Sequence, residues 1–191
     1  MKPRAPPLEC ITTALIEETT GVGVEEHNCL DELEIIFSSL KCVALDDGAS
    51  GGTYRSGLGR CARLRRLSLI DCGLESLGTL RPISATLERL CVADQRLTRL
   101  TGLGALPQLR WLYAQQNAIQ KLEGLDECPR LRSLWVFSNR IARVEGLSEL
   151  GELRELWLQE NRITRLGGME ALVALRDLQL GGNQCWNQSL V

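Results

Sequence analysis

Leucines and other apolar residues recur at constant offsets along most of this 191-residue chain. Residues 109–125 (LRWLYAQQNAIQKLEGL), 131–147 (LRSLWVFSNRIARVEGL) and 153–169 (LRELWLQENRITRLGGM) share one pattern, and their first leucines lie 22 residues apart. A fixed period of this size is typical of repeat proteins, in which stacked units bury a core that one unit cannot form alone. The pattern therefore predicts one elongated domain built from similar units.

The first part of each unit has the alternation of a strand. In LRWLYAQQN, Leu112 and Ala114 alternate with Trp111, Tyr113 and Gln115. A period of two is expected for a short strand with one buried face. Stacked units then form a parallel sheet, and the second set of side chains lies on its outer face.

The remainder of each unit has its own regularities. Four units carry an asparagine at the ninth position: Asn117, Asn139, Asn161 and Asn183. An asparagine amide can satisfy backbone groups of the turn that leaves the strand. We expect a less regular arrangement in the earlier units, where this position holds Gln95, Cys72 and Gly48. Apolar residues then recur every three positions, which predicts short helical or 3-10 segments on the side opposite the strands.

We place seven units, which start near residues 40, 64, 87, 109, 131, 153 and 175. The repeat domain then covers residues 40–191, and its last unit is incomplete. We expect fraying or association at that end unless more chain follows, because no unit covers its leucines. Residues 1–39 form an N-terminal segment, whose spacing predicts helices over residues 8–18 and 24–40. The second helix is acidic and amphipathic, and suits a cap on the first unit.

The pattern LxxLxLxxNxIxxLxGLxxL resembles the 22-residue class of leucine-rich repeats found in the regulatory subunit of protein phosphatase 1 and in axonemal dynein assembly factors. This resemblance covers about residues 40–183. It implies an α/β solenoid with a curved parallel sheet on the concave face and short helical or 3-10 segments on the convex face. The segments LEIIFSSL, LWVFSNRIARVEGL and LRELWLQENRI further resemble the amino-terminal repeats of leucine-rich-repeat-containing protein nine, a longer family associated with motile cilia.

Composition narrows the classes of function. The net charge is −2, which argues against nucleic acid or an anionic membrane as the default partner. No apolar run is long enough to cross a bilayer and no signal peptide is visible, so we expect a cytoplasmic protein. The eight cysteines show no CxxC spacing and no paired clusters, which favours reduced, buried thiols over a disulfide framework.

The residues for catalysis are scarce. His27 is the only histidine, so no histidine-based triad and no multi-histidine metal site can be assembled. We expect it to be a solvated helix residue. The glycines near residues 21 and 48 lack the context of nucleotide-binding motifs. We therefore expect neither an enzyme nor a cofactor.

The most informative feature of the chain is aromatic. Five of the eight aromatic residues fall on outward strand positions of neighbouring units: Trp111, Tyr113, Trp135, Phe137 and Trp157. One interpretation is cross-strand stacking that only stabilises the sheet. The other is a partner-binding ridge, because exposed aromatic patches are enriched where partners bind. Arg66 and Arg89 make the early part of this face basic, whereas three later residues make it acidic: Glu155, Glu160 and Asp177.

Two arginine-rich series also recur at a spacing of 22, one beside the start of the strands and one beyond the asparagines. A solvated edge and a contact with an acidic partner both fit these series. The resemblance to the ciliary family makes an axonemal tubulin tail one candidate for such a partner.

The sequence thus predicts a non-enzymatic scaffold that binds a protein partner through the aromatic ridge together with Arg89, Glu155 and Glu160. The resemblance implies a ciliary, axonemal or cytoskeletal setting. Two alternatives stay open: a regulatory or targeting subunit that binds a phosphatase catalytic subunit, and an RNA–protein assembly, which the near-zero net charge disfavours.

Overall fold

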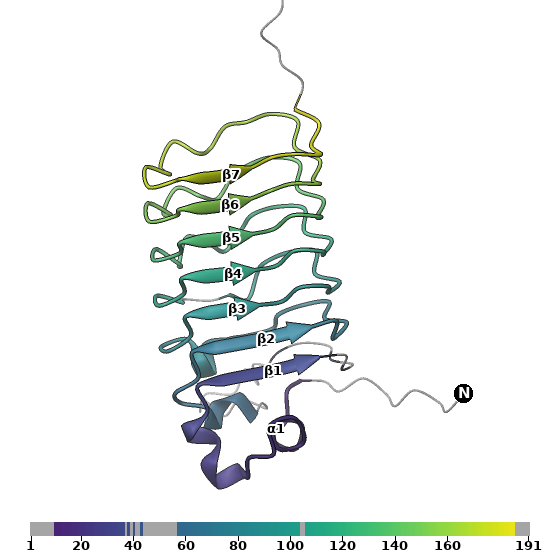
Figure 1. The fold of residues 1–191 in the computed structure, drawn as a ribbon, viewed down its shortest axis with the longest axis vertical. Helices are drawn as coiled ribbons and strands as arrows, with labels where there is room; N and C mark the ends of the chain where they lie inside the picture. Colours follow the sequence, from purple (N-terminus) through teal and green to yellow (C-terminus); the bar gives the residue numbers. More distant parts are fainter. Residues whose placement is uncertain are drawn as a thin grey trace, which may run out of the picture.

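A computed structural model of the chain describes residues 10–36, 38, 40, 43, 57–103 and 106–185. Figure 1 shows the strands stacked one above another in chain order. They form a seven-stranded sheet in which every neighbouring pair is parallel. The predicted solenoid is confirmed, with its parallel sheet on one side and little helix on the other.

The strands are short, and equivalent residues of successive units lie side by side. Their bounds are β1 (Glu32–Ile36), β2 (Arg66–Ile70), β3 (Arg89–Cys91), β4 (Trp111–Tyr113), β5 (Ser133–Trp135), β6 (Glu155–Trp157) and β7 (Asp177–Gln179). Leu112 pairs with Leu134, which pairs with Leu156. These leucines are fully buried, while both neighbours of Leu112 and of Leu156 in their strands are partly exposed. The predicted alternation is therefore present.

The first strand lies where we expected a helix. The segment 24–40 contains the 3-10 helix η1 (Val24–Cys29) and then β1, so the helix predicted over 24–40 is wrong. Leu33 and Ile35 are buried and alternate with glutamates, so the same apolar residues fit a period of two as well as a helical one. Pairing with β2 decides between the two, because it lets β1 extend the sheet.

The sheet register also moves the start of the first unit. Glu32 pairs with Arg66, which puts Leu30 at the position that Leu64 occupies in the next unit. The first unit therefore begins near residue 30 rather than 40. The motif that we expected to start it, residues 40–45, lies mostly outside the described residues, as does Gly48.

The N-terminal segment includes the helix α1 (Thr13–Thr20), which overlaps the helix predicted over residues 8–18 but begins later and continues through Thr19 and Thr20. The hydroxyl of Thr12 caps the helix by accepting a hydrogen bond from the Leu15 N–H at 3.1 Å. Gly21, at a φ of 70°, ends it. Ile16 is fully buried, and α1 packs against β1 and the 3-10 helix η2 (Gly57–Arg60). Figure 1 shows α1 below β1, at the N-terminal end of the stack.

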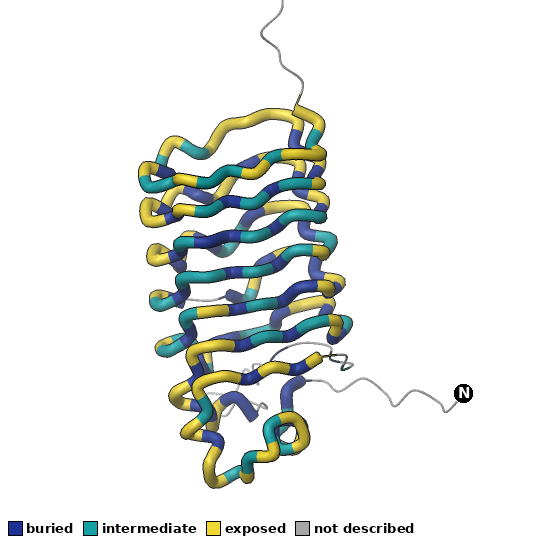
Figure 2. The backbone as a smooth tube through the Cα atoms, in the orientation of Figure 1, coloured by how far each residue is buried: buried dark blue, intermediate teal, exposed yellow. Residues whose placement is uncertain are grey.

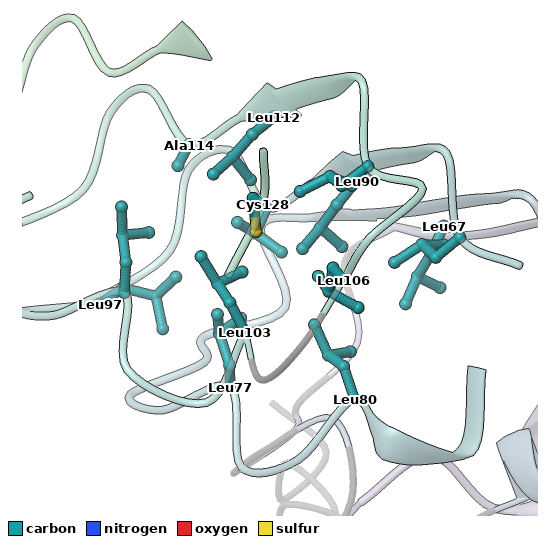
Figure 3. Packing of buried hydrophobic residues seen from close by; sticks show 14 of the residues in the cluster. Leu67, Leu77, Leu80, Leu90, Leu97, Leu103, Leu106, Leu112, Ala114 and Cys128 are labelled. Atoms are coloured by element: carbon teal, nitrogen blue, oxygen red, sulfur yellow. The ribbon is translucent and has the colours of Figure 1, made fainter. Parts of the chain in front are cut away.

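A continuous apolar core runs along the stack. Figure 3 shows leucines of successive units packed on one another between the strands and the return segments. In Figure 2 these buried positions recur at the same place in successive turns of the tube, from β1 to β6. The predicted 3-10 segments appear as η2 and η3 (Arg81–Ile83). The later units instead have consecutive single turns, such as Cys128 N–H to Leu125 C=O at 3.0 Å.

The ninth-position side chains link neighbouring units. Asn139 donates to the carbonyl oxygens of Ala114 (3.0 Å) and Val136 (3.0 Å), while its Oδ1 accepts from the Ile119 N–H at 2.9 Å. Asn117, Asn161 and Asn183 repeat this arrangement. Each amide therefore satisfies backbone groups in two units at once.

We expected a less regular arrangement at the ninth position of the earlier units. At Gln95, the hydrogen bonds differ little from those of the asparagines. Its Oε1 accepts from the Cys72 N–H (3.1 Å) and the Leu74 N–H (2.9 Å), and its Nε2 donates to Leu69 C=O (3.0 Å). The extra methylene still lets the amide reach the preceding unit. At Cys72 the thiol donates to Ile35 C=O at 3.3 Å, so even this weak donor keeps one of the links.

Four of the described cysteines are buried, as expected: Cys10, Cys61, Cys72 and Cys128. Burial raises the pKa of the Cys128 thiol to about 11. The thiolate is therefore scarce near neutral pH, which makes this residue a small hydrophobe rather than a nucleophile. Cys29 and Cys185 are exposed.

The last described unit is less buried than the unit before it. Leu153, Leu156 and Leu158 are fully buried in β6 and its flanks, whereas the equivalent residues of the β7 unit, Leu175, Leu178 and Leu180, are only partly buried. Among the described residues, the β7 unit has a neighbouring unit on one side only. No described helix is long and apolar enough to span a membrane.

Replacing Asn139 with alanine should lower the free energy of unfolding by about 2 kcal/mol or more, because it strands buried backbone groups in two units. Gln120→Ala is the matched control, since Gln120 is an exposed side chain of the same region and should change stability by less than about 0.5 kcal/mol. Urea unfolding followed by circular dichroism measures both. Equal midpoints for the two variants would contradict the linking role.

Glycines of the return segments allow close approach between units. Gly146 has a φ of 76°, and a Cβ there would lie 2.0 Å from the Leu122 carbonyl oxygen. Gly146→Ala should therefore cost about 2 kcal/mol or more, from strain and from displacement of the neighbouring unit. Gly151→Ala, where a Cβ meets nothing within 4 Å, should be nearly neutral. Thermal unfolding compares the two, and a tolerated Gly146→Ala would count against this packing.

Candidate functional site

The outward side chains of the strands form a surface that we call the strand face. Two rows cross it, because equivalent residues of neighbouring strands pair directly. One row runs Arg66, Arg89, Trp111, Ser133, Glu155 and Asp177. The other runs Ser68, Cys91, Tyr113, Trp135, Trp157 and Gln179. Adjacent strands lie about 5 Å apart, so each row is a line of neighbouring side chains.

Three aromatic rings of the second row are in contact. The ring centroids of Tyr113 and Trp135 lie 4.6 Å apart with a tilt of 53°, and those of Trp135 and Trp157 lie 4.1 Å apart with the planes at 1°. Phe137 lies at the edge of this group, with its ring centroid 6.4 Å from that of Trp157. We call these four residues the aromatic stack. The contact that the spacing of 22 predicted between rings is present.

Trp111 belongs to a different contact. The guanidinium carbon of Arg89 lies 5.0 Å from the centroid of the Trp111 ring, within the range of a cation–π interaction. The five aromatic residues predicted as one ridge therefore divide into the aromatic stack and an Arg89–Trp111 pair. The two groups adjoin, because Trp111 and Tyr113 are both in β4.

The aromatic stack carries a cost that stacking alone does not explain. All four rings remain partly exposed. The Nε1 of Trp135 is buried and has no hydrogen-bond partner among the described residues. A buried N–H without a partner costs on the order of 1–3 kcal/mol, which a phenylalanine ring would avoid. This cost offsets what the Trp135 ring gains by stacking on Trp157.

The carboxylates on the acidic side of the strand face accept hydrogen bonds from uncharged side chains. Glu155 accepts from the Ser133 hydroxyl at 2.7 Å. Asp177 accepts from Trp157 Nε1 at 3.1 Å and from Gln179 Nε2 at 2.8 Å. Among the described residues, neither carboxylate has a salt-bridge partner. Sequence reasoning missed Ser133 as a positioning residue, although its place in the row follows from the spacing.

Glu160 lies at the rim rather than in either row. It follows the strand in the turn, has a φ of 54°, and accepts from the Ser138 hydroxyl at 2.6 Å. Non-glycine residues take the left-handed conformation at the same position in four other units: Asp71, Asp94, Gln116 and Ser138. Asparagine, aspartate and glycine favour this conformation, but only Asp71 and Asp94 of the five residues are of these types, so residue type alone does not predict the turn in every unit.

The basic side of the strand face contains one arginine without a carboxylate partner. Arg66 pairs with Glu32 at 3.1 Å and Arg65 with Glu88 at 3.3 Å. Arg89 forms no salt bridge with a described residue. These side chains border a hollow of about 360 Å³, lined by Asp31, Arg65, Arg66, Glu88, Arg89 and Trp111.

The arginine series outside the strand face fit a solvated edge. Arg132 pairs with Glu152 at 3.2 Å and Arg99 approaches Glu123 at 3.8 Å. Exposed pairs of this kind contribute about 0–1 kcal/mol, so they neither hold the fold nor mark a site.

His27 differs from its predicted environment. Its side chain is fully buried rather than solvated, with Nε2 3.2 Å from the Val22 carbonyl oxygen. The prediction was wrong because the segment is a tight 3-10 turn that folds the ring inward, not the exposed face of a helix. Within the described residues, no cluster of three or more histidine, cysteine or acidic side chains could hold a metal ion.

Comparisons with known proteins agree with the observed fold. Residues 95–182 match the sequence model of a family described as leucine-rich repeat. Among solved structures, an internalin (inlF) from Listeria monocytogenes is similar, with a TM-score of 0.61 and 23% identity over 87% of this chain; the chain spans 46% of that internalin. An internalin C2 (inlC2) from the same organism gives a TM-score of 0.53 and 14% identity, covering 92% of this chain and 100% of that one. No curated protein sequence matches the chain.

The chain therefore has the leucine-rich-repeat fold. This fold is usually non-catalytic and typically serves protein–protein interaction.

A double-mutant cycle tests whether the rings of the aromatic stack stabilise one another or contribute to stability independently. Trp135→Ala and Trp157→Ala should show a coupling of about 0.5–1.5 kcal/mol in unfolding free energy, because each ring loses its partner in the other variant. The control pair, Trp157→Ala with Arg89→Ala, joins side chains three strands apart and should be additive within about 0.5 kcal/mol. Additive effects at Trp135 and Trp157 would rule out the stack.

Proposed function

We propose that this protein is a non-enzymatic scaffold that binds a protein partner through the strand face, with the aromatic stack as the centre of the contact. The observation that carries the proposal is the continuous contact of Tyr113, Trp135 and Trp157 on the outer side of the sheet. Large aromatic side chains that are already ordered lose little conformational entropy on binding and dominate binding energy at interfaces.

The surroundings of the stack support the same function. Core leucines lie under the strands, so the backbone that carries the rings is fixed before a partner arrives. Arg89 flanks one side and Glu155 and Asp177 the other, as a polar rim flanks the apolar centre of an interface. Glu160 adds a further carboxylate at the border.

The sequence resemblance to the repeats of leucine-rich-repeat-containing protein nine supports a ciliary, axonemal or cytoskeletal assembly in the cytoplasm as the setting. An axonemal or tubulin-associated protein is then the favoured partner. The solved structures that resemble the chain speak for its fold alone.

A second candidate is a regulatory or targeting subunit of a protein phosphatase. It is favoured by the carboxylates beside Trp157, since the resemblance to the phosphatase regulator implies a concave face with aromatic and acidic residues. Purified phosphatase 1 catalytic subunit tests it by direct titration. Absence of a complex at micromolar concentration would remove this candidate.

The experiment for the main proposal compares wild-type protein with two variants as baits in extracts of ciliated cells. Trp157→Ala should weaken binding of the true partner about 30-fold or more, because a hot-spot ring typically contributes 2 kcal/mol or more. Gln120→Ala, outside the strand face, is the control and should retain every partner. Trp111→Ala adds a variant whose ring lies outside the stack, in case Trp157→Ala lowers stability. Partners that are unchanged by both tryptophan variants, with folding intact, would reject the strand face as the binding surface.

A further inference from the structure

The charges at the two ends of the aromatic stack are opposite, and no described residue neutralises them by a salt bridge. Arg65 and Arg66 are paired with glutamates, which leaves Arg89 as the cation over Trp111. At the other end, Glu155 and Asp177 accept only from neutral groups. A partner that supplied both missing counter-charges would gain at both ends.

The spacing of these charges is fixed by the sheet. Arg89, Glu155 and Asp177 occupy the same row, in β3, β6 and β7. With strands about 4.8 Å apart, Arg89 lies roughly 14 Å from the Glu155 position and roughly 19 Å from the Asp177 position. The aromatic stack fills the interval, in β4 to β6.

We propose that the strand face binds an amphipathic helix of a partner protein, laid across the strands, with a carboxylate side chain at Arg89–Trp111 and a lysine or arginine at Glu155–Asp177. This inference rests on the proposed function and adds the chemistry of the partner to it. Two apolar side chains of the helix would pack on the aromatic stack between the charged ends.

A helix fits this surface better than an extended segment does. The backbone groups of neighbouring strands already bond to one another, so an extended chain crossing them would leave its own N–H and C=O groups without partners. A helix satisfies its backbone internally. At 1.5 Å per residue, a separation of about 14–19 Å corresponds to roughly 10–13 residues, and positions i and i+11 lie on the same side of a helix. Positions i+4 and i+7 then face the rings.

The same charges argue for a protein segment and against a nucleic acid. A single strand of RNA stacks on exposed rings but needs a continuous basic track for its phosphates. Glu155 and Asp177 would repel those phosphates at one end of the stack.

The test is a selection from a displayed library of helical peptides, built on an alanine-rich background with positions i, i+4, i+7 and i+11 randomised. Wild-type protein should enrich peptides with one acidic and one basic residue at i and i+11, in either order, since a helix can lie in either direction. Apolar residues should be enriched between them. Arg89→Glu should switch the preference to two basic residues. Arg140→Glu, the same change of charge at an exposed residue outside the strand face, should leave the preference unchanged.

The selected peptides are then titrated by fluorescence anisotropy. At low salt, the acid–base peptide should bind wild-type protein at least about 10-fold more tightly than its acid–acid and base–base counterparts, because each mismatch places like charges together. The Arg89→Glu variant should instead bind the base–base peptide more tightly than the acid–base peptide.

The outcomes separate the two proposals. Peptides that require Trp157 but show no charge preference would overturn the charge-matched helix and leave the strand face as a binding surface. Peptides indifferent to both Trp157 and Arg89 would overturn both. Failure of the folded wild-type protein to enrich any helix, or tight binding of a 20-nucleotide single-stranded RNA that is lost in Arg89→Glu, would overturn the helical partner.

Discussion

The structure depends on one constraint: no unit can bury its leucines without a neighbour, so every unit must repeat the register of the one before it. The sheet satisfies this constraint by direct pairing of equivalent residues, as in Leu112, Leu134 and Leu156. The ninth-position amides reinforce it, since Asn139 bonds to backbone groups in two units. Glycines with a positive φ, such as Gly146, help to satisfy the constraint because they let the return segments of neighbouring units approach closely.

The same constraint generates the surface that we propose as the binding site. A fixed register places outward residues of successive units in rows. A type of side chain that is repeated at one position therefore forms a continuous patch. Tyr113, Trp135 and Trp157 become a stack in this way. Residues that vary along the other row become a gradient, from Arg89 to Asp177. Fold and candidate site thus share one origin, although only the fold depends on the buried residues.

The sequence predicts the fold well because the repeat supplies the same information several times, and the alternation around Leu112 and Ala114 survives in each copy. The prediction fails at the first unit, because the apolar residues around Leu33 fit the period of a helix as well as that of a strand. Only the pairing with β2 makes this segment a strand. Ring contacts were predictable from the spacing, and so was the separation of Trp111 from the stack, because Trp111 pairs with Ser133 whereas Tyr113 pairs with Trp135. The Arg89 contact of Trp111 and the burial of His27 depend on local geometry that spacing does not encode.

The most direct test of the central claim observes the rings themselves while a partner binds. The indole N–H resonances of Trp111, Trp135 and Trp157 can be followed by NMR in ¹⁵N-labelled protein, with and without a protein partner that the wild-type bait retains. Engagement of the strand face predicts that all three signals shift or broaden on binding, while backbone amides of the convex turns stay in place. Unchanged indole signals together with shifts on the convex side would contradict the account.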